Sequence, residues 1–380
     1  MFRADQVGSF LRSPALKDAR AAREAGTLSP DQLRQIEDDE ILRVIDMQKE
    51  VGIDVFSDGE FRRGGWASDF QDAVEGYVPG SPPVTMSWHT GGDGEAATPQ
   101  QGPPAGAGGG GAGFTRVIGG KLRPRRRLTE HEVSFLKQHA PGPFKMTMPA
   151  ATYVVTRGYK PGVTDSVYES RTAVLRDAAA IIGHELEALA GEGVPYLQLD
   201  NPHYPDYISD ERREQWRGLG VDPDQALRDD IAADNASVAG LDRSRVTVGM
   251  HLCRGNGPLG RWHTAGGYER IAEQVFGGID VDRFLLEYDS ERAGGFEPLR
   301  FMPPGKIVVL GLITTKSGQL ETEDTLLRRI DEAARFVPIE NLALSPQCGF
   351  ASTLVGNPLS ADEQRRKLEL VVRTARKVWG

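Results

Sequence analysis

The sequence predicts an α/β fold in which eight parallel strands close into a (β/α)8 TIM barrel. Short apolar runs alternate with amphipathic segments along most of the 380 residues, a pattern typical of a parallel sheet connected by helices. We count eight such runs, the number of strands in this barrel. An open, doubly wound sheet is the alternative. It is disfavoured because no glycine-rich dinucleotide fingerprint follows the first run.

The predicted strands are apolar runs of four to six residues. They lie at residues 6–9, 53–57, 144–148, 196–200, 246–251, 283–287, 307–312 and 342–345. Helical periodicity fills most of the intervals between them. The predicted helices lie at residues 31–51, 166–192, 223–239, 267–277, 323–336 and 361–378.

One region breaks this alternation. Residues 77–128 contain Pro-Pro and Gly-Gly pairs and the glycine-rich tract at residues 105–113. Such a stretch buries little apolar area and loses much backbone entropy on folding. We therefore predict a long excursion between strands two and three, and a single catalytic domain over residues 1–380.

Composition narrows the class of partner to small molecules. The net charge of -9 argues against nonspecific binding to nucleic acid. No apolar stretch approaches the roughly 20 residues that a membrane span needs. Two cysteines that lie 95 positions apart do not make a disulfide framework. We also see no N-terminal run of charged residues followed by apolar ones, the pattern of a secretory signal peptide. We expect a cytoplasmic protein with reduced thiols; a homo-oligomer is compatible with the sequence.

Metal-ligating residue types occur where three of the predicted strands end. His251 and Cys253 are two residues apart, so both point to one face of a strand. Glu287 and Cys348 occupy corresponding positions at later strand ends, and such ends converge at one mouth of a barrel. Imidazole, two thiolates and a carboxylate suit zinc. The structural alternative is a pair of core cysteines, because buried cysteine behaves as a small hydrophobe.

Further polar residues follow other strands. Glu60 and Arg62 come after the second strand, and Asp200 ends the fourth. Acidic residues at a strand end bind an ammonium or a metal, or cap the next helix. Ser9 ends the first strand, where its hydroxyl either donates to a carboxylate ligand or forms a turn.

Taken together, these motifs resemble the C-terminal catalytic barrel of cobalamin-independent methionine synthase, most closely its short, single-barrel members. The resemblance runs from Val7 to about Thr353, and the acidic residue usual after the aspartate is replaced by Asn201. The matching motifs are Val7-Gly8-Ser9-Phe10, Asp58-Gly59-Glu60-Phe61-Arg62, Asp200 in Leu-Asp-Asn-Pro, His251-Leu252-Cys253, Glu287 and Pro346-Gln347-Cys348-Gly349.

The resemblance implies a cofactor, a substrate and roles for these residues. Zinc would be held by His251, Cys253, Glu287 and Cys348. Asp200 and Glu60 would bind the amino group of homocysteine, with Ser9 near its carboxylate and Arg62 as a further substrate-binding candidate. The implied activity is a zinc-dependent thiol methyltransferase of methionine biosynthesis, with methyl-folate or another methyl carrier as the donor. A zinc-bound thiol loses its proton and stays nucleophilic at neutral pH.

Two alternatives remain open at this stage. The barrel also resembles epoxyalkane:coenzyme M transferase, which adds a sulfonated thiol to an epoxide and needs cations at the mouth. The candidate cations are Arg62, Arg63, Arg123, Arg125, Arg126 and Arg127. The other alternative is a zinc-binding barrel without catalysis, serving as a sensor or metal store.

Overall fold

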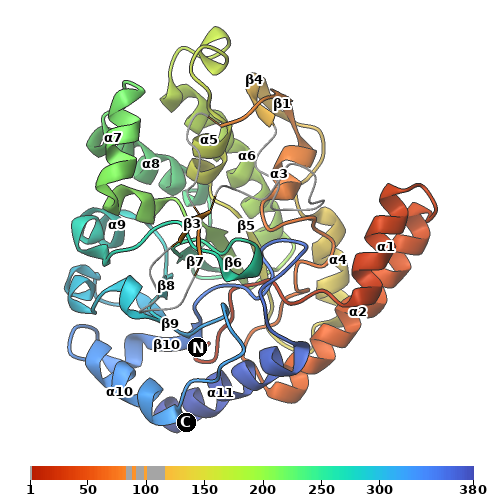
Figure 1. Cartoon of the computed structure of the whole chain (residues 1–380), viewed down its shortest axis with the longest axis vertical. Coiled ribbons are helices and arrows are strands. Elements are labelled where there is room, and N and C mark those ends of the chain that lie inside the picture. The colour runs from red at the N-terminus through yellow and green to blue at the C-terminus, as the bar shows by residue number, and fades with distance from the viewer. Residues whose placement is uncertain (1, 83–87, 91–97, 101–115) are drawn as a thin grey trace.

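The computed structural model describes residues 2–82, 88–90, 98–100 and 116–380 (Figure 1). The glycine-rich tract at residues 105–113 lies outside the described residues. Within the described part, no helix is long and apolar enough to cross a membrane.

A six-stranded parallel sheet forms the centre of the molecule. Its order is β10-β9-β8-β7-β6-β5, so each strand pairs with its neighbour in the chain. Nearly every residue of these strands is buried, as expected for a parallel sheet covered on both faces. The predicted strands three to eight are confirmed to within two residues. They are β5 (Lys145–Pro149), β6 (Tyr196–Asp200), β7 (Thr247–Leu252), β8 (Arg283–Glu287), β9 (Ile307–Ile313) and β10 (Leu342–Pro346).

The first two predicted strands are wrong as regular strands. Residues 6–9 form none, because Gly8 has φ +149°, a conformation that interrupts an extended ladder. Ala4 instead makes a single parallel bridge to Leu344 of β10. Residues 53–57 contribute only a bridge from Phe56 to Phe144, since the Gln48 side chain bonds both backbone groups of Ser57.

These two segments nevertheless lie between the edges of the sheet. The backbone N–H of Asp54 donates to the carbonyl of Ala4 (3.1 Å), which links the segment beside β10 to the segment beside β5. Inside the sheet, the carboxylate of Asp5 accepts from Lys145 of β5 (2.8 Å) and from Arg283 of β8 (3.2 Å). The N-terminal segment is therefore fixed to strands from both halves of the sheet.

Helices surround this sheet in Figure 1. All six predicted helices are present, and the helix predicted at 267–277 begins later because residues 268–270 form a 3-10 turn. The sequence patterns missed five others, namely α1, α3, α4, α5 and α7. The helices are α1 (Pro14–Glu24), α2 (Pro30–Val51), α3 (Ser68–Ala73), α4 (Glu130–His139), α5 (Ala151–Gly158), α6 (Arg171–Gly191), α7 (Asp210–Gly218), α8 (Pro223–Val238), α9 (Ala272–Gly278), α10 (Glu323–Ala333) and α11 (Ala361–Trp379).

Besides α3 and α4, the described parts of the region between Phe56 and β5 contain two small antiparallel sheets. β1 (Val74–Pro79) pairs with β4 (Arg116–Pro124), and β2 (Trp88–Thr90) pairs with β3 (Thr98–Gln100). β2 also meets the loop after β7, because His89 and Trp262 exchange backbone hydrogen bonds of 2.8 and 3.2 Å. This pairing carries Trp88 to the carboxyl end of the central sheet.

Candidate metal centre and substrate cavity

A cavity of about 150 Å³ lies at the carboxyl ends of the central strands. It gathers residues from six separate strand ends and loops, which is where a parallel α/β fold places its ligands. Of the eight predicted site residues, six line it and two, Glu287 and Arg62, do not. The six are Ser9, Glu60, Asp200, His251, Cys253 and Cys348.

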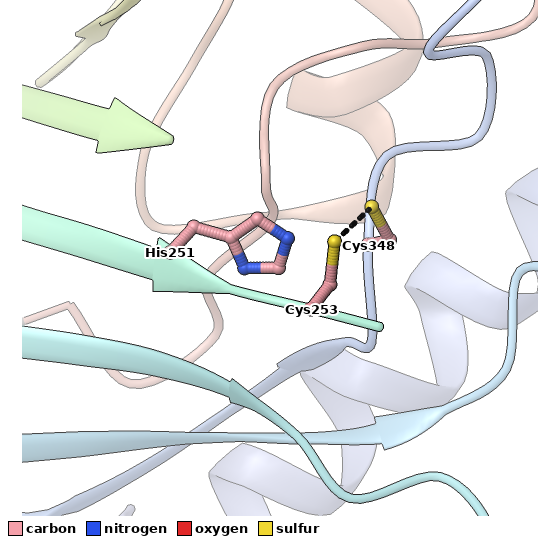
Figure 2. A group of neighbouring side chains, drawn as sticks. All are labelled: His251, Cys253 and Cys348. Carbon is pink, nitrogen blue, oxygen red and sulfur yellow. Dashed lines mark hydrogen bonds between the residues drawn. The ribbon is translucent and has the colours of Figure 1, made fainter. Parts of the chain in front are cut away.

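His251, Cys253 and Cys348 form a compact group (Figure 2). Their ligand-type atoms all lie within 4.8 Å of one another, and the two sulfurs are 3.9 Å apart. His251 and Cys253 come from the end of β7, and Cys348 comes from the loop after β10. The predicted convergence of these three side chains is therefore seen in the structure.

The donor set of this group fits a soft divalent cation. Nδ1 of His251 is 3.1 Å from the carbonyl of Leu285, so this nitrogen carries the proton. Nε2 is buried and makes no hydrogen bond to the described residues, which leaves its lone pair for a ligand bond. Both cysteines are free and buried. The neighbouring Cys348 and burial raise the pKa of Cys253 well above its ordinary value, so a positive charge is needed to ionise it.

Glu287 is held apart from this group. It is fully buried, and its carboxylate accepts from the backbone N–H of Arg254 (2.6 Å) and from the guanidinium of Arg292 (2.9 Å). Burial favours the neutral acid, but Lys316, Arg292 and Arg254 outweigh it and lower the pKa of Glu287 to about 2. Glu287 is a permanent anion beside the sulfur ligands.

Glu60 and Asp200 place two carboxyl groups in the cavity wall. Glu60 has φ +59°, a strained conformation for a side-chain-bearing residue. Its Oε1 accepts from the Thr147 hydroxyl (2.8 Å), while its buried Oε2 has no hydrogen-bond partner among the described residues. Oδ1 of Asp200 accepts from Gln198 (2.7 Å). Burial raises the pKa of Asp200 to about 7, with Glu60 adding to the effect and His251 opposing it.

Ser9 lies between these acids and the sulfur ligands. Its hydroxyl oxygen accepts from the backbone N–H of Ala351 (3.4 Å), three residues beyond Cys348. Gly349 has no room for a side chain, because a Cβ there would lie 2.0 Å from the Ser9 oxygen. The loop that carries Cys348 thus packs directly on the first strand segment.

The arginines singled out from the sequence lie elsewhere. Arg62 pairs with Asp38 (2.6 Å) and stacks over Phe135, away from the cavity. Arg63 is buried against Glu132 and the carbonyl of Thr147. Arg125 pairs with the exposed Glu75, and Arg127 pairs with Glu185, whose side chain is buried. The arginine that does line the cavity is Arg157, on a helix that the sequence patterns missed.

Aromatic residues complete the cavity wall. Trp66, Trp88 and Tyr153 line it together with His263. None of them directly follows one of the eight strands predicted from the sequence, so the spacing of those strand ends could not identify them. They reach the cavity from a loop, from β2, from the first turn of α5 and from the loop after β7.

This architecture defines the class of the protein: a parallel α/β fold whose strand ends bring thiols, imidazole and carboxylates into one cavity. The family described as "Cobalamin-independent synthase, Catalytic domain" matches residues 2–87 and 161–377, and the chain belongs to this family. The predicted family is thereby confirmed.

Relatives and solved structures agree with this membership. The chain is 38% identical over 381 residues to the uncharacterised protein YxjG of Bacillus subtilis, covering 100% of this chain and 95% of YxjG. It is 22% identical over 348 residues to a methionine synthase of Pyrococcus abyssi, covering 90% of this chain and 85% of that enzyme. A candidate vitamin-B12-independent methionine synthase from Listeria monocytogenes has a similar structure, with a TM-score of 0.72 and 30% identity, covering 100% and 98% of the two chains.

A B12-independent methionine synthase from Shewanella sp. W3-18-1, solved in complex with selenomethionine, shares the fold. Its TM-score is 0.71 at 19% identity, with 100% of this chain and 98% of that chain covered. The α/β fold with a parallel sheet is therefore confirmed by structures as well as by family.

Proposed function

We propose that this chain is a zinc-dependent methyltransferase that transfers a methyl group to the thiol of homocysteine and so forms methionine. The observation that carries the proposal is the group of two buried thiols and an imidazole, with ligand atoms within 4.8 Å, in one cavity with Glu60 and Asp200. Family membership supports the methyl transfer. The donor in this proposal is methyl-folate or another methyl carrier.

The same proposal takes the fold to be a closed barrel. The bridges at Ala4 and Phe56, and the hydrogen bond between Asp54 and Ala4, support closure of the six-stranded sheet by two short segments.

We further propose that residues 1–380 act as a single catalytic domain, and that the protein works in the cytoplasm, where thiols stay reduced.

His251, Cys253 and Cys348 would hold the zinc ion. When bound, zinc supplies a positive charge that ionises an incoming thiol at neutral pH. His251 is already oriented for this role by the carbonyl of Leu285, which fixes the protonated nitrogen and leaves Nε2 as the ligand atom. Glu287, the fourth residue of the predicted ligand set, would have to leave Arg254 and Arg292 before its carboxylate could bind the ion.

Glu60 and Asp200 would bind the ammonium group of homocysteine. The unpartnered Oε2 of Glu60 is an acceptor without a donor in the cavity, which an ammonium would satisfy. An ammonium beside Asp200 also favours its ionised form, against the burial that raises its pKa. Ser9 would contact the carboxylate of the substrate. Holding both ends of the amino acid aims its thiol toward the sulfur ligands.

The test compares substrate binding with metal content. In zinc-loaded protein, we expect Asp200→Asn to weaken homocysteine binding at least tenfold while the zinc content stays at one ion per chain. Asp222→Asn is the matched control, because it removes the same charge from an exposed helix cap where asparagine serves equally well. Calorimetric titration and measurement of methionine formation give the two readouts. Unchanged homocysteine affinity in Asp200→Asn contradicts the assignment.

The arginines that the sequence suggested for the epoxide-adding alternative do not supply its cations at the mouth, and Arg157 of α5 is an arginine that does line the cavity. Arg62, Arg63, Arg125 and Arg127 are engaged with acidic partners, and neither they nor Arg123 and Arg126 line the cavity. The non-catalytic alternative predicts stoichiometric zinc with no binding of homocysteine. The titration above separates it from the enzyme.

A further inference from the structure

The wall of the cavity facing the sulfur ligands is rich in aromatic rings. Trp66 and Tyr153 form a corner, with ring centroids 4.5 Å apart and planes inclined at 46°. Trp88 is a third ring in the same cavity and packs edge-on against His263, with centroids 5.3 Å apart. Three electron-rich faces around a small space are the arrangement that proteins use to hold methylated cations.

Trp66 and Trp88 each contact a loop that carries a sulfur ligand. The backbone N–H of Trp66 donates to the carbonyl of Ser352 (3.2 Å), and the hydroxyl of Ser352 lies 4.0 Å from the Cys348 sulfur. Trp88 packs on Gly257, and His263 packs on Gly255, two residues beyond Cys253; a Cβ on either glycine would clash with these rings. Trp66, Trp88 and Tyr153 therefore line the same cavity as the two cysteines that Figure 2 shows.

The charges of the wall also favour a small cation. Among the described residues of the wall, Glu60 and Asp200 contribute two carboxyl groups, and Arg157 contributes a guanidinium. Arg157 offers a partner for a carboxylate on the same ligand.

We propose that the methyl donor is a small onium compound, a sulfonium or a quaternary ammonium that carries a carboxylate, held by its methyl groups against Trp66, Trp88 and Tyr153. The proposal rests on the proposed methyl transfer to homocysteine and names its donor. The carboxylate of the donor faces Arg157. The methyl group that is transferred points from the aromatic wall toward the sulfurs.

The chemistry of such a donor balances without a further reactant. The homocysteine thiol gives up its proton to solvent on binding, and a sulfur lone pair of the thiolate forms the new S–C bond. The bond from the methyl carbon to the onium atom breaks, and its electron pair stays on that atom, which leaves as a neutral thioether or tertiary amine. No oxidant or reductant is involved, and the leaving group needs no proton.

Binding of betaine is the first test, because it does not depend on turnover. Betaine and 3,3-dimethylbutanoate have the same shape and carboxylate but differ in the charge of the central atom. We expect betaine to bind about tenfold more tightly, measured by calorimetry on the full chain. Trp66→Leu should remove this preference, and Trp66→Phe should retain part of it. Trp379→Leu, on α11 far from the cavity, should leave it unchanged. Equal binding of the two ligands, or a preference that survives in Trp66→Leu, overturns the proposal.

Turnover is the second test. Zinc-loaded protein is given deuterium-labelled homocysteine with S-methylmethionine, dimethylsulfoniopropionate, betaine or 5-methyltetrahydrofolate, and labelled methionine is measured by mass spectrometry. Product from either sulfonium compound, or from betaine, supports the proposal and distinguishes the two onium classes. Product from the folate alone overturns the onium donor and leaves the proposed function standing. If no donor gives methionine and homocysteine does not bind, the proposed function fails, and the betaine comparison still decides whether the aromatic site exists.

Discussion

Two clusters of metal-ligand residue types occur among the described residues, and they differ in whether a cation of the protein already lies within them. His251, Cys253 and Cys348 form one. Asp69, His131 and Glu132 form the other, and in each the ligand atoms lie within 4.8 Å. In the second cluster, the guanidinium of Arg63 lies 3.2 Å from Asp69 and 2.6 Å from Glu132. That cluster contains its own cation.

The pKa shifts express this difference. In the second cluster, burial would raise the pKa of Glu132, but Arg63 lowers it, and burial together with Glu132 raises the pKa of Asp69 well above its ordinary value. The Arg63–Glu132 ion pair thus satisfies the charges within the protein. In the sulfur cluster, the pKa of Cys253 is raised and His251 Nε2 is unpartnered. Proximity of ligand atoms is therefore a weaker criterion for a metal site than an unmet demand for positive charge.

The largest effect expected from this comparison is on zinc affinity. Cys253→Ser or Cys348→Ser replaces a soft ligand by a hard, neutral hydroxyl, and should lower zinc affinity on the order of a hundredfold to a thousandfold. His131→Asn, the control in the second cluster, should bind one zinc ion per chain with wild-type affinity. Competition with a chromophoric chelator measures both. Zinc loss in His131→Asn with retention in both cysteine variants would reverse the comparison.

The second prediction concerns stability. Arg63→Met leaves Glu132 buried without its counter-charge, and should lower the free energy of unfolding by about 3 to 5 kcal/mol. Arg62→Met is a matched control, because its nearer partner Asp38 is 25% exposed and can be solvated after the change, and its second partner Glu37 keeps Arg20 at 2.8 Å. We expect about 1 kcal/mol for this control. Urea unfolding of both variants provides the measurement, and equal losses would show that Arg63 does not neutralise the second cluster.

Asp58, beside the second cluster, should make stability depend on pH. Burial, and after it Glu132, raises the pKa of Asp58 to about 7, with Arg63 opposing. Between about pH 4 and pH 7 the folded chain keeps a proton that the unfolded chain has lost, so the free energy of unfolding falls as the pH rises. Asp58→Asn should remove this contribution and raise stability at pH 8 by on the order of 2 to 4 kcal/mol, with no gain at pH 4. A gain of the same size at both pH values would rule out titration of Asp58 as the cause.

The sequence predicted the part of the site that follows from strand geometry. Strands three to eight are apolar runs because they are buried on both faces, and alternation along β7 places His251 and Cys253 on one side. The break at Gly8 and the hydrogen bonds between Gln48 and Ser57 could not be predicted from the apolar pattern, because they depend on one dihedral angle and one side chain. The prediction of the first two segments as regular strands was therefore wrong.

What the sequence could not provide are the contributions of loops. Arg62 and Arg63 are neighbours and both are buried, yet the turn in which the N–H of Arg63 donates to the carbonyl of Glu60 sends one guanidinium toward Asp38 and the other toward Glu132. Trp66, Trp88 and Tyr153 reach the cavity through packing between segments distant in sequence. No periodicity encodes such contacts, since they arise only when the sheet has brought its loops together.

The smallest expected effect on zinc affinity concerns Glu287, the fourth predicted ligand, which the structure shows bound to Arg254 and Arg292. Glu287→Gln keeps the size of the side chain and its acceptor oxygen for the N–H of Arg254, but removes the charge that balances Arg292 and Lys316. Because the carboxylate is held by these partners and lies outside the three-residue group, its loss should act through the electrostatic field alone. We expect zinc affinity to fall about tenfold, as for a residue that orients or balances a site rather than a ligand. The chelator competition used for the cysteine variants gives the comparison under identical conditions. A loss as large as that of Cys348→Ser would mean that Glu287 leaves Arg292 and binds the ion directly, and the four-residue ligand set implied by the sequence resemblance would then be correct.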